Sequence, residues 1–394
     1  MIQVLIIGAG PTGLTLAIEL ARRGIAVRII DKSRARPKYE SRAIGTHART
    51  MEIFERLNVL DEMFALGLKW RGFNFHANGK QIGRLDFAAI DSKFNFALIL
   101  PQAETERILR QKLESLGVQI EFETELTAIQ QTETAVSATL KDQTGNTTEI
   151  ETEFLIGCDG AKSITRKLLN IMFAGKRLQG SYLVDCEIDW QGRAPFAEGN
   201  TFFKKGWRLI VGQLPENRYR VVVNLADDDP RMRDATPTLP LMQKFVDEVN
   251  LKISLQKLTW ASAFWLSVRR ADKMRAGRAF LAGDAAHNVC PNAGQGMNAG
   301  IHDAVVLADK LALFFKNKFN KNLLDDYERE RLPTIKKLLA ASERMENLMT
   351  LRNDAAARVR NYLLPLAIKS DFLQKKIVNQ IAGLKVEFNS KSDK

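Results

Sequence analysis

Two aspartates in this sequence stand where a short apolar run gives way to a turn. Asp284 follows residues 279–283, and Asp159 follows residues 154–158. Apolar runs of this length that stop at a glycine are typical of buried strands, so each carboxylate is expected at the carboxyl end of a strand. Carboxylates placed there can accept hydrogen bonds from a polar ligand. The alternative for Asp159 is that it caps the helix expected to follow it.

A glycine-rich loop at the N-terminus indicates the kind of ligand. Gly8, Gly10 and Gly13 form G-x-G-x-x-G after the apolar residues 2–7, and Asp31 ends the next apolar run. In this motif the first glycine permits a tight turn, the second lets the backbone approach a pyrophosphate, and the third lets helix and strand pack closely. The helix start attracts the phosphates, and the acid accepts from a ribose hydroxyl. The motif in this context predicts a dinucleotide site.

The loop after Gly283-Asp284 is a second place that favours negative charge. It contains Pro291 and continues through Gly296, Met297 and Asn298 into apolar residues at helical spacing. A helix start carries the positive end of the helix dipole, so it can stabilise an anionic ligand. His287 lies in the same loop, where it acts either as a base or as a residue that orders the loop.

Other polar side chains have less specific surroundings. Arg42 and Arg49 flank the start of an expected helix, and each is either a pyrophosphate ligand or a surface cation. Gln102 falls at a strand–helix junction, where its amide either reaches a ligand or caps the helix. Pocket aromatics are expected among five residues of the β-rich part, with no single one assigned: Phe202, Phe203, Trp207, Phe264 and Trp265.

Composition narrows the class of protein. The 394 residues carry a formal net charge of +12, but the basic residues are spread over helical stretches and match no nucleic-acid-binding motif, so no nucleic-acid partner is expected. Three separated cysteines give neither a disulfide framework nor a zinc pattern. We find no signal peptide and no transmembrane segment, and expect a cytoplasmic monomer or homodimer.

Three motifs in this order resemble the flavin-dependent aromatic hydroxylases, the single-component FAD monooxygenases typified by p-hydroxybenzoate hydroxylase. They are the glycine fingerprint with Asp31, the D-G-x-x-S-x-x-R element from Asp159 to Arg166, and the G-D element at Gly283 with the loop after it. Asp31 departs from the glutamate usual in that family. We expect no thioredoxin-like third domain of the phenol hydroxylase branch. A second dinucleotide fingerprint is also absent, as in that family.

The resemblance implies an α/β fold: a Rossmann-like FAD-binding three-layer ββα sandwich with an inserted antiparallel β-sheet substrate domain and C-terminal helices. The FAD-binding domain would comprise residues 1–70, 97–174 and 271–320. The substrate-binding domain would comprise residues 71–96 and 175–270. Residues 321–394 would form a C-terminal helical segment.

The resemblance also implies roles for single residues. Asp284 would bind the ribityl hydroxyls of FAD and Asp31 its adenosine ribose, while Arg42 and Gln102 would contact the pyrophosphate. Asp159 and Arg166 would serve both FAD and the nicotinamide donor. Backbone groups of residues 296–298 would face the pyrimidine edge of the flavin, and Pro291 would lie beside the ring.

The expected function is hydroxylation of an aromatic, phenolic or polycyclic substrate with O2 and NADPH or NADH, through a flavin hydroperoxide. The alternatives are an epoxidase or prenyl-chain reductase of the same fold, or a flavin redox sensor without turnover. The absence of a W-x-W-x-I-P segment disfavours a halogenase.

Overall fold

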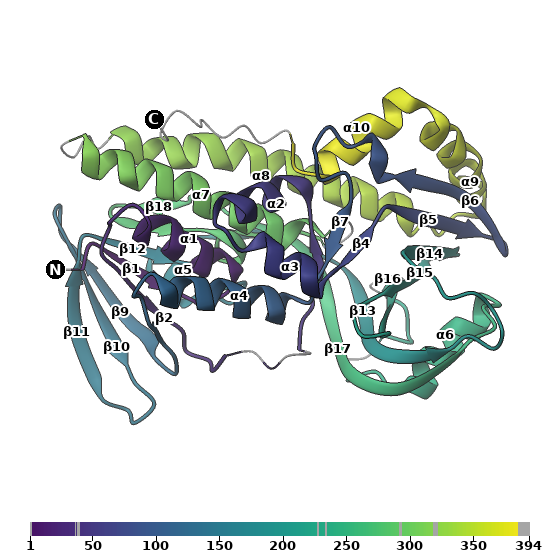
Figure 1. The fold of residues 1–394 in the computed structure, drawn as a ribbon, viewed down its shortest axis with the longest axis horizontal. Coiled ribbons are helices and arrows are strands. Elements are labelled where there is room, and N and C mark those ends of the chain that lie inside the picture. The colour runs from purple at the N-terminus through teal and green to yellow at the C-terminus, as the bar shows by residue number, and fades with distance from the viewer. Residues whose placement is uncertain are drawn as a thin grey trace.

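A mainly parallel sheet of apolar strands organises the first part of the chain in the computed structural model (Figure 1). The model describes residues 2–35, 37, 40–226, 228–232, 235–290, 294–317 and 322–384. The sheet has the order β18-β19-β12-β1-β2-β8, and only β18 pairs antiparallel. The strands are β1 (Val4–Ile7), β2 (Val27–Ile30), β8 (Ile120–Glu121), β12 (Phe154–Gly157), β18 (Arg275–Ala276) and β19 (Ala279–Leu281).

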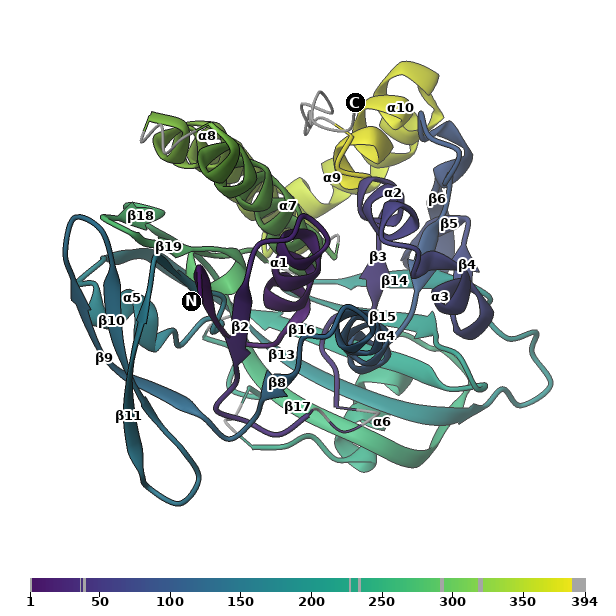
Figure 2. The same cartoon turned by 60° about the vertical axis from the view of Figure 1, so that its left-hand side comes forward.

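Both faces of this sheet are covered, which is why its central strands are apolar at every position. Val4 and Ile6 pack in the cluster that includes the helices α1 (Pro11–Ala21), α4 (Gln102–Ser115) and α7 (Gln295–Lys316). Leu5 and Ile7 face an antiparallel meander of β9 (Glu125–Gln131), β10 (Val136–Lys141) and β11 (Thr147–Thr152). Figure 2 shows the meander on one side of the sheet and the helices on the other. The predicted three-layer ββα sandwich is confirmed.

A second sheet, of order β20-β17-β13-β16-β15-β14-β5-β6, forms the other large part of the molecule. Its strands are β5 (Gly72–Ala77), β6 (Lys80–Asp86), β13 (Phe173–Asp189), β14 (Gly199–Lys204), β15 (Trp207–Gln213), β16 (Tyr219–Ala226), β17 (Ser254–Ala271) and β20 (His287–Asn288). All neighbours are antiparallel except β14 and β5. The long strands β13 and β17 run along most of this sheet (Figure 1).

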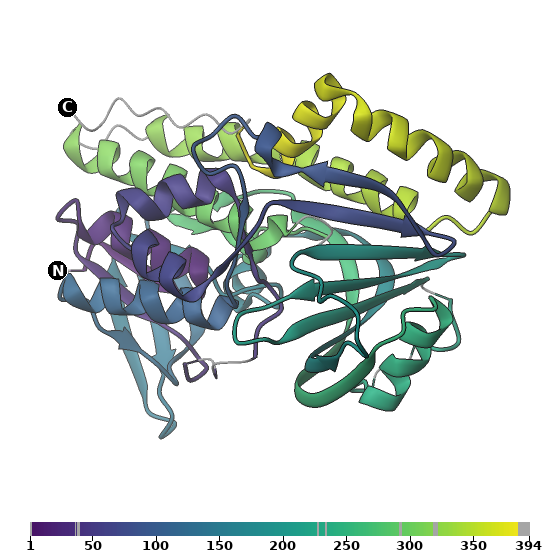
Figure 3. The ribbon, with the colours of Figure 1, turned by 45° about the vertical axis from the view of Figure 1, so that its right-hand side comes forward.

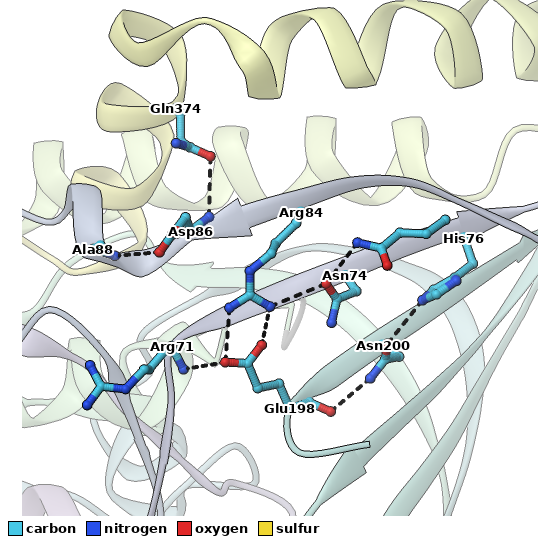
Figure 4. Close-up of polar contacts among 10 residues, drawn as sticks. Arg71, Asn74, His76, Arg84, Asp86, Ala88, Glu198, Asn200 and Gln374 are labelled. Atoms are coloured by element: carbon cyan, nitrogen blue, oxygen red, sulfur yellow. Dashed lines mark hydrogen bonds and ion pairs between the residues drawn. The ribbon is translucent and has the colours of Figure 1, made fainter. Parts of the chain in front are cut away.

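The hairpin β5–β6 forms at the Asn78-Gly79 turn, as its sequence predicts. Both turn residues have positive φ, 52° and 76°, which a tight hairpin turn of this kind requires. Polar contacts anchor the hairpin to the sheet (Figure 4): Glu198 pairs with Arg84, and His76 lies 3.0 Å from Asn200 Oδ1. Because side chains alternate along a strand, these contacts on one face of β5 fix the direction of the aromatic residues on its other face.

The remaining elements connect the two sheets or pack around them. They are β3 (Gly45–Thr46), β4 (Leu68–Trp70), β7 (Ala97–Ile99), α2 (Ala48–Arg56), α3 (Leu60–Leu66), α5 (Ile164–Leu168), α6 (Leu239–Glu248), α8 (Asn322–Met349), α9 (Asp354–Lys369), α10 (Asp371–Ile381) and the 3₁₀ turns Phe87–Ala89 and Gly283–Ala285. Figure 3 shows α9 and α10 lying over β5 and β6. Within the described residues, none of the helices combines the length and apolarity needed to cross a membrane.

Candidate cofactor and substrate site

A cavity of about 1650 Å³ lies between the two sheets. Gly10, Asp31 and Asp284 line it from the parallel-sheet side, and Leu183 and Val222 line it from the second sheet. A pocket for one drug-sized ligand usually measures roughly 300–1,000 Å³. This cavity therefore has room for two ligands side by side, one against the glycine loops and one against the second sheet.

The three glycines of the N-terminal loop differ in what surrounds them. Gly8 has φ +104°, and a Cβ added there would lie 2.5 Å from the carbonyl oxygen of Cys158. A Cβ on Gly13 would lie 1.9 Å from the carbonyl oxygen of Gly8. Gly10, by contrast, has no atom within 4 Å of its Cβ position and borders the cavity. Gly8 and Gly13 thus serve the turn and the packing, while Gly10 leaves space for a ligand.

Two helix starts meet this cavity. Helix α1 begins after Gly10 and α7 after Gly294, and neither N-terminus has a side-chain cap or an acidic residue in its first turn. Pro11 and Thr12 of α1, and Gly296 of α7, line the cavity. The unpaired N–H groups of both first turns are therefore available to negative charge on a ligand. A dinucleotide with a pyrophosphate fits this arrangement.

The predicted acids occupy different positions around the cavity. Asp31 accepts hydrogen bonds from the backbone N–H groups of Ala9 and Ser33, both at 2.8 Å. Asp159 accepts from Ser163 Oγ at 2.5 Å and from the backbone N–H and hydroxyl of Thr165 at 3.0 Å. Ser163 is the N-cap of α5, and Asp159 adds an acceptor for the Thr165 N–H of its first turn, so Asp159 helps to cap the helix while it also borders the cavity.

Asp284 is the acid that projects most freely into the cavity. Its side chain is accessible there, whereas Gly283 and Ala285 on either side are buried. Desolvation by the surrounding protein, with the negative charge of Asp303, raises the pKa of Asp284, and His287 and Arg42 only partly offset that effect. A carboxylate held in this way gains from hydroxyl groups that donate to it.

Arg42 and Gln102 line the cavity, but Arg49 does not. The Arg42 guanidinium donates to Ser262 Oγ at 3.4 Å and lies 4.8 Å from the ring centre of Phe264. Gln102 is the first residue of α4, and its amide donates to Glu106 at 2.7 Å. Arg49 pairs with Glu52 at 2.7 Å, one turn further along α2. The structure thus places Arg42 and Gln102 together and leaves Arg49 outside the cavity.

Arg166 links the segment after Asp159 to the segment after Asp284. Its guanidinium donates to the carbonyl oxygens of Ala285 at 2.8 Å and Ala161 at 2.9 Å, and it stacks 3.8 Å from the ring centre of Phe173. It also lines a smaller depression of about 390 Å³ next to the main cavity. The described residues around that depression include no acid and five bases: Lys162, Arg166, Lys167, Arg177 and Arg269. This depression is suited to an anionic group.

The loop after Asp284 is held by a buried polar cluster that the sequence analysis did not identify. Asp303 accepts from His287 Nε2 at 2.5 Å, from the Gly283 N–H at 3.0 Å and from Arg331 Nε at 2.6 Å. Burial acts to raise the pKa of Asp303, but its partners His287 and Arg331 hold that pKa well below the usual range. His287 is not among the residues that line the cavity, so its position fits the loop-ordering reading.

The other residues of this loop lie as follows. Met297 and Gly296 border the cavity, whereas Asn298 accepts from the His47 N–H at 3.0 Å and donates to the Gly45 carbonyl at 2.9 Å. Asn298 thus joins the start of α7 to β3. Pro291 lies outside the described residues. The sequence signal for this buried cluster is Asp303, an acid within the apolar helical pattern of α7.

The aromatic residues of the β-rich part separate into two groups. Phe264 and Trp265 line the cavity, while Phe202, Phe203 and Trp207 are buried elsewhere in the hydrophobic cores. Because neighbours on one strand face opposite sides, Phe264 and Trp265 of β17 reach the cavity from different faces of the strand, and alternation alone does not account for the division.

Fold and site together define a class of protein with a dinucleotide site beside room for a second ligand. Residues 1–342 match the family described as FAD binding domain. The chain belongs to this family, and its cofactor is FAD.

Similar proteins include two bacterial monooxygenases. The chain is 34% identical over 363 residues to 6-methylpretetramide 4-monooxygenase of Streptomyces rimosus, with 90% of this chain and 63% of that protein covered. It is 32% identical over 352 residues to pentachlorophenol 4-monooxygenase of Sphingobium chlorophenolicum, with 88% and 64% covered. The chain thus spans slightly less than two thirds of the length of each of these relatives.

A solved structure shows the same fold. The crystal structure of p-nitrophenol 4-monooxygenase from Pseudomonas putida superimposes with a TM-score of 0.86, at 21% sequence identity, and covers 98% of both chains.

Proposed function

We propose that this protein is an FAD- and NAD(P)H-dependent monooxygenase that hydroxylates an aromatic small molecule with O2. The observation that carries the proposal is the continuous cavity that joins the cofactor loops to a largely apolar row of the second sheet. That wall would hold an organic substrate next to the cofactor and away from water. The relatives, which are named as monooxygenases of aromatic compounds, support the same reaction class.

The residues around the cavity would divide the binding of FAD among them. The first turn of α1 would bind the pyrophosphate where Gly10 leaves space, with Arg42 and Gln102 beside it. Asp31 would accept from the adenosine ribose and Asp284 from the ribityl hydroxyls.

The start of α7 would stabilise the reduced cofactor. Gly296 and Met297 border the cavity at the N-terminus of α7, where the helix dipole favours negative charge. Bound FAD supplies the redox chemistry and the activated oxygen. The protein's own contribution is to hold the two ligands, exclude water and stabilise charge.

The nicotinamide donor would meet the basic depression next to the cavity. Its phosphate groups would bind near Lys162, Arg166 and Arg269, and Asp159 would lie between this depression and FAD. Transient docking at such a surface needs no second glycine fingerprint. The division into a cofactor domain and a substrate domain, the monomeric or homodimeric state and the cytoplasmic location stay predictions.

The test is a measurement of cofactor binding followed by turnover. Purified protein should bind FAD, seen by quenching of the free-flavin fluorescence, and should oxidise NADPH or NADH faster when an aromatic substrate is added. With ¹⁸O2, the product should contain one labelled oxygen. FAD binding with no stimulated oxidation across a panel of phenols and polycyclic compounds would favour a redox sensor. Turnover without label would favour a reductase.

A further inference from the structure

The substrate side of the cavity has an ordered wall. Residues that pair across neighbouring strands point to the same face of a sheet, so each set of paired residues forms a row. One row contains Phe264, Ser181, Asn224 and Arg208. The next row, two residues further along each strand, contains Leu183, Val222, Ile210, Thr201 and Phe75. All nine residues line the cavity, so a polar row lies beside a largely apolar one.

The polar row contains hydrogen-bonding atoms without a partner. Ser181 is fully buried and Asn224 is 2% exposed, yet neither Ser181 Oγ nor Asn224 Oδ1 makes a hydrogen bond within the part of the chain that the structure describes. Protein interiors pair nearly all such atoms, because leaving them unpaired is costly. Both residues border the cavity. A ligand is therefore the natural source of the missing hydrogen bonds.

A third unpartnered polar atom belongs to a residue that lines the cavity elsewhere. Trp70 of β4 is 7% exposed and lines the cavity, and among the described residues its buried indole Nε1 has no partner. Its ring packs on Gly212, where an added Cβ would lie 2.3 Å from it. Gly212 pairs with Arg220, four positions along β16 from Asn224. At roughly 3.3 Å per residue, the two polar positions are separated by about 13 Å along the strands.

Charge adds to the polar row. Arg208 forms a buried ion pair with Glu346 at 2.9 Å. Arg360 is also buried beside the cavity, where it donates to the carbonyl oxygens of Met349 at 3.1 Å and Leu348 at 3.3 Å. Burial and the neighbouring Arg208 lower the pKa of Arg360 to about 10, so it stays a cation at neutral pH. Two guanidinium groups against one carboxylate favour an electron-rich oxygen substituent nearby.

We propose that Ser181, Asn224 and the Trp70 indole bind the two ends of an elongated, fused-ring aromatic substrate with oxygen substituents at both ends. This inference rests on the proposed function and narrows its substrate class. The apolar row contacts the ring faces, and the polar groups at either end bind the oxygens. A single-ring phenol is too short to reach both.

The test uses the FAD-loaded full chain and two probes that differ by one hydroxyl group: 2,6-dihydroxyanthraquinone and 2-hydroxyanthraquinone. Their dissociation constants are measured from the change in the spectrum of the bound oxidised flavin, which requires no turnover. We expect the wild type to prefer the dihydroxy probe by roughly five- to ten-fold. Ser181→Ala, Asn224→Leu and Trp70→Phe should each reduce that preference toward one, because the second hydroxyl then loses a partner.

Thr105→Val is the matched control, because it removes a buried hydroxyl that also has no partner among the described residues but does not line the cavity. It should keep the preference of the wild type. Equal binding of both probes to the wild type, or an unchanged preference in all three variants, overturns the inference even if FAD binds and hydroxylation occurs. Failure to bind FAD, in contrast, would contradict the proposed function itself.

Discussion

Arg220, which lines the cavity, and Asp185 form a buried, bidentate ion pair. Arg220 Nε and Nη2 each donate to an oxygen of Asp185 at 2.8 Å, and the side chains are 5% and 2% exposed. The same guanidinium donates to the carbonyl oxygens of Ser41 and Arg42. The pair therefore ties the second sheet to the segment that carries Arg42 into the cofactor site.

Arg220→Met should destabilise the protein by about 3–5 kcal/mol, because it leaves the Asp185 carboxylate buried without its partner. The double variant Arg220→Met with Asp185→Leu should recover much of that loss. Both variants should bind FAD more weakly, since the carbonyl oxygens of residues 41–42 lose the hydrogen bonds from Arg220. Urea unfolding and FAD titration measure the two effects. A single variant within 1 kcal/mol of the wild type would show that the pair is not required.

Gly8→Ala and Gly10→Ala are predicted to fail in different ways. At Gly8 the added methyl group would meet the Cys158 carbonyl at 2.5 Å in a backbone conformation of φ +104°, so the fold itself should be destabilised. At Gly10 the methyl group enters open cavity, so the melting temperature of the apoprotein should stay near that of the wild type while FAD affinity falls at least about ten-fold. Equal FAD affinity in Gly10→Ala would contradict the assigned pyrophosphate position.

Asp284→Ala should weaken FAD binding by about ten-fold or more, since the proposed ribityl hydroxyls would lose a charged hydrogen-bond acceptor. It should not lower the stability of the apoprotein, because the raised pKa indicates that its surroundings disfavour the carboxylate. The FAD affinity of Asp284→Asn should lie between those of Asp284→Ala and the wild type. Asp61→Ala, an exposed acid in the first turn of α3, is the control and should leave FAD affinity unchanged. Unchanged FAD affinity in Asp284→Ala would remove this residue from the site.

The buried His302 is expected to make the free energy of unfolding depend on pH in the acid range. Burial, followed by the nearby Arg331, lowers its pKa to about 3, whereas the unfolded chain has a histidine pKa near 6.5. Below pH 6.5 the unfolded state therefore binds a proton that the folded state does not. As the pH falls from 6.5 to 4, the contribution of His302 to the free energy of unfolding should fall by up to about 1.4 kcal/mol per pH unit.

His302→Gln should remove most of this slope, as measured by urea unfolding at pH 7.5, 6, 5 and 4.5. The glutamine can still reach Thr50, which lies 3.1 Å from His302 Nε2. An identical slope in this variant and the wild type would assign the acid sensitivity to other groups.

Features that depend on neighbours in sequence could be predicted well. The glycine loop at Gly8, the hairpin turn at Asn78-Gly79 and the two Asp-Gly junctions are contiguous motifs, and each imposes a local conformation on its own. Alternating and continuous apolar runs predicted the strands for the same reason. The three-layer fold followed from the resemblance that these motifs carried.

What only the tertiary structure decided is which side chains meet. Arg42 and Arg49 look alike in sequence, yet one borders the cavity and the other pairs with Glu52. Ser181, Asn224 and Trp70 come from three separate strands, and their missing hydrogen bonds appear only once the surrounding atoms are in place. Strand register and packing set these contacts over long sequence separations, so no local pattern encodes them.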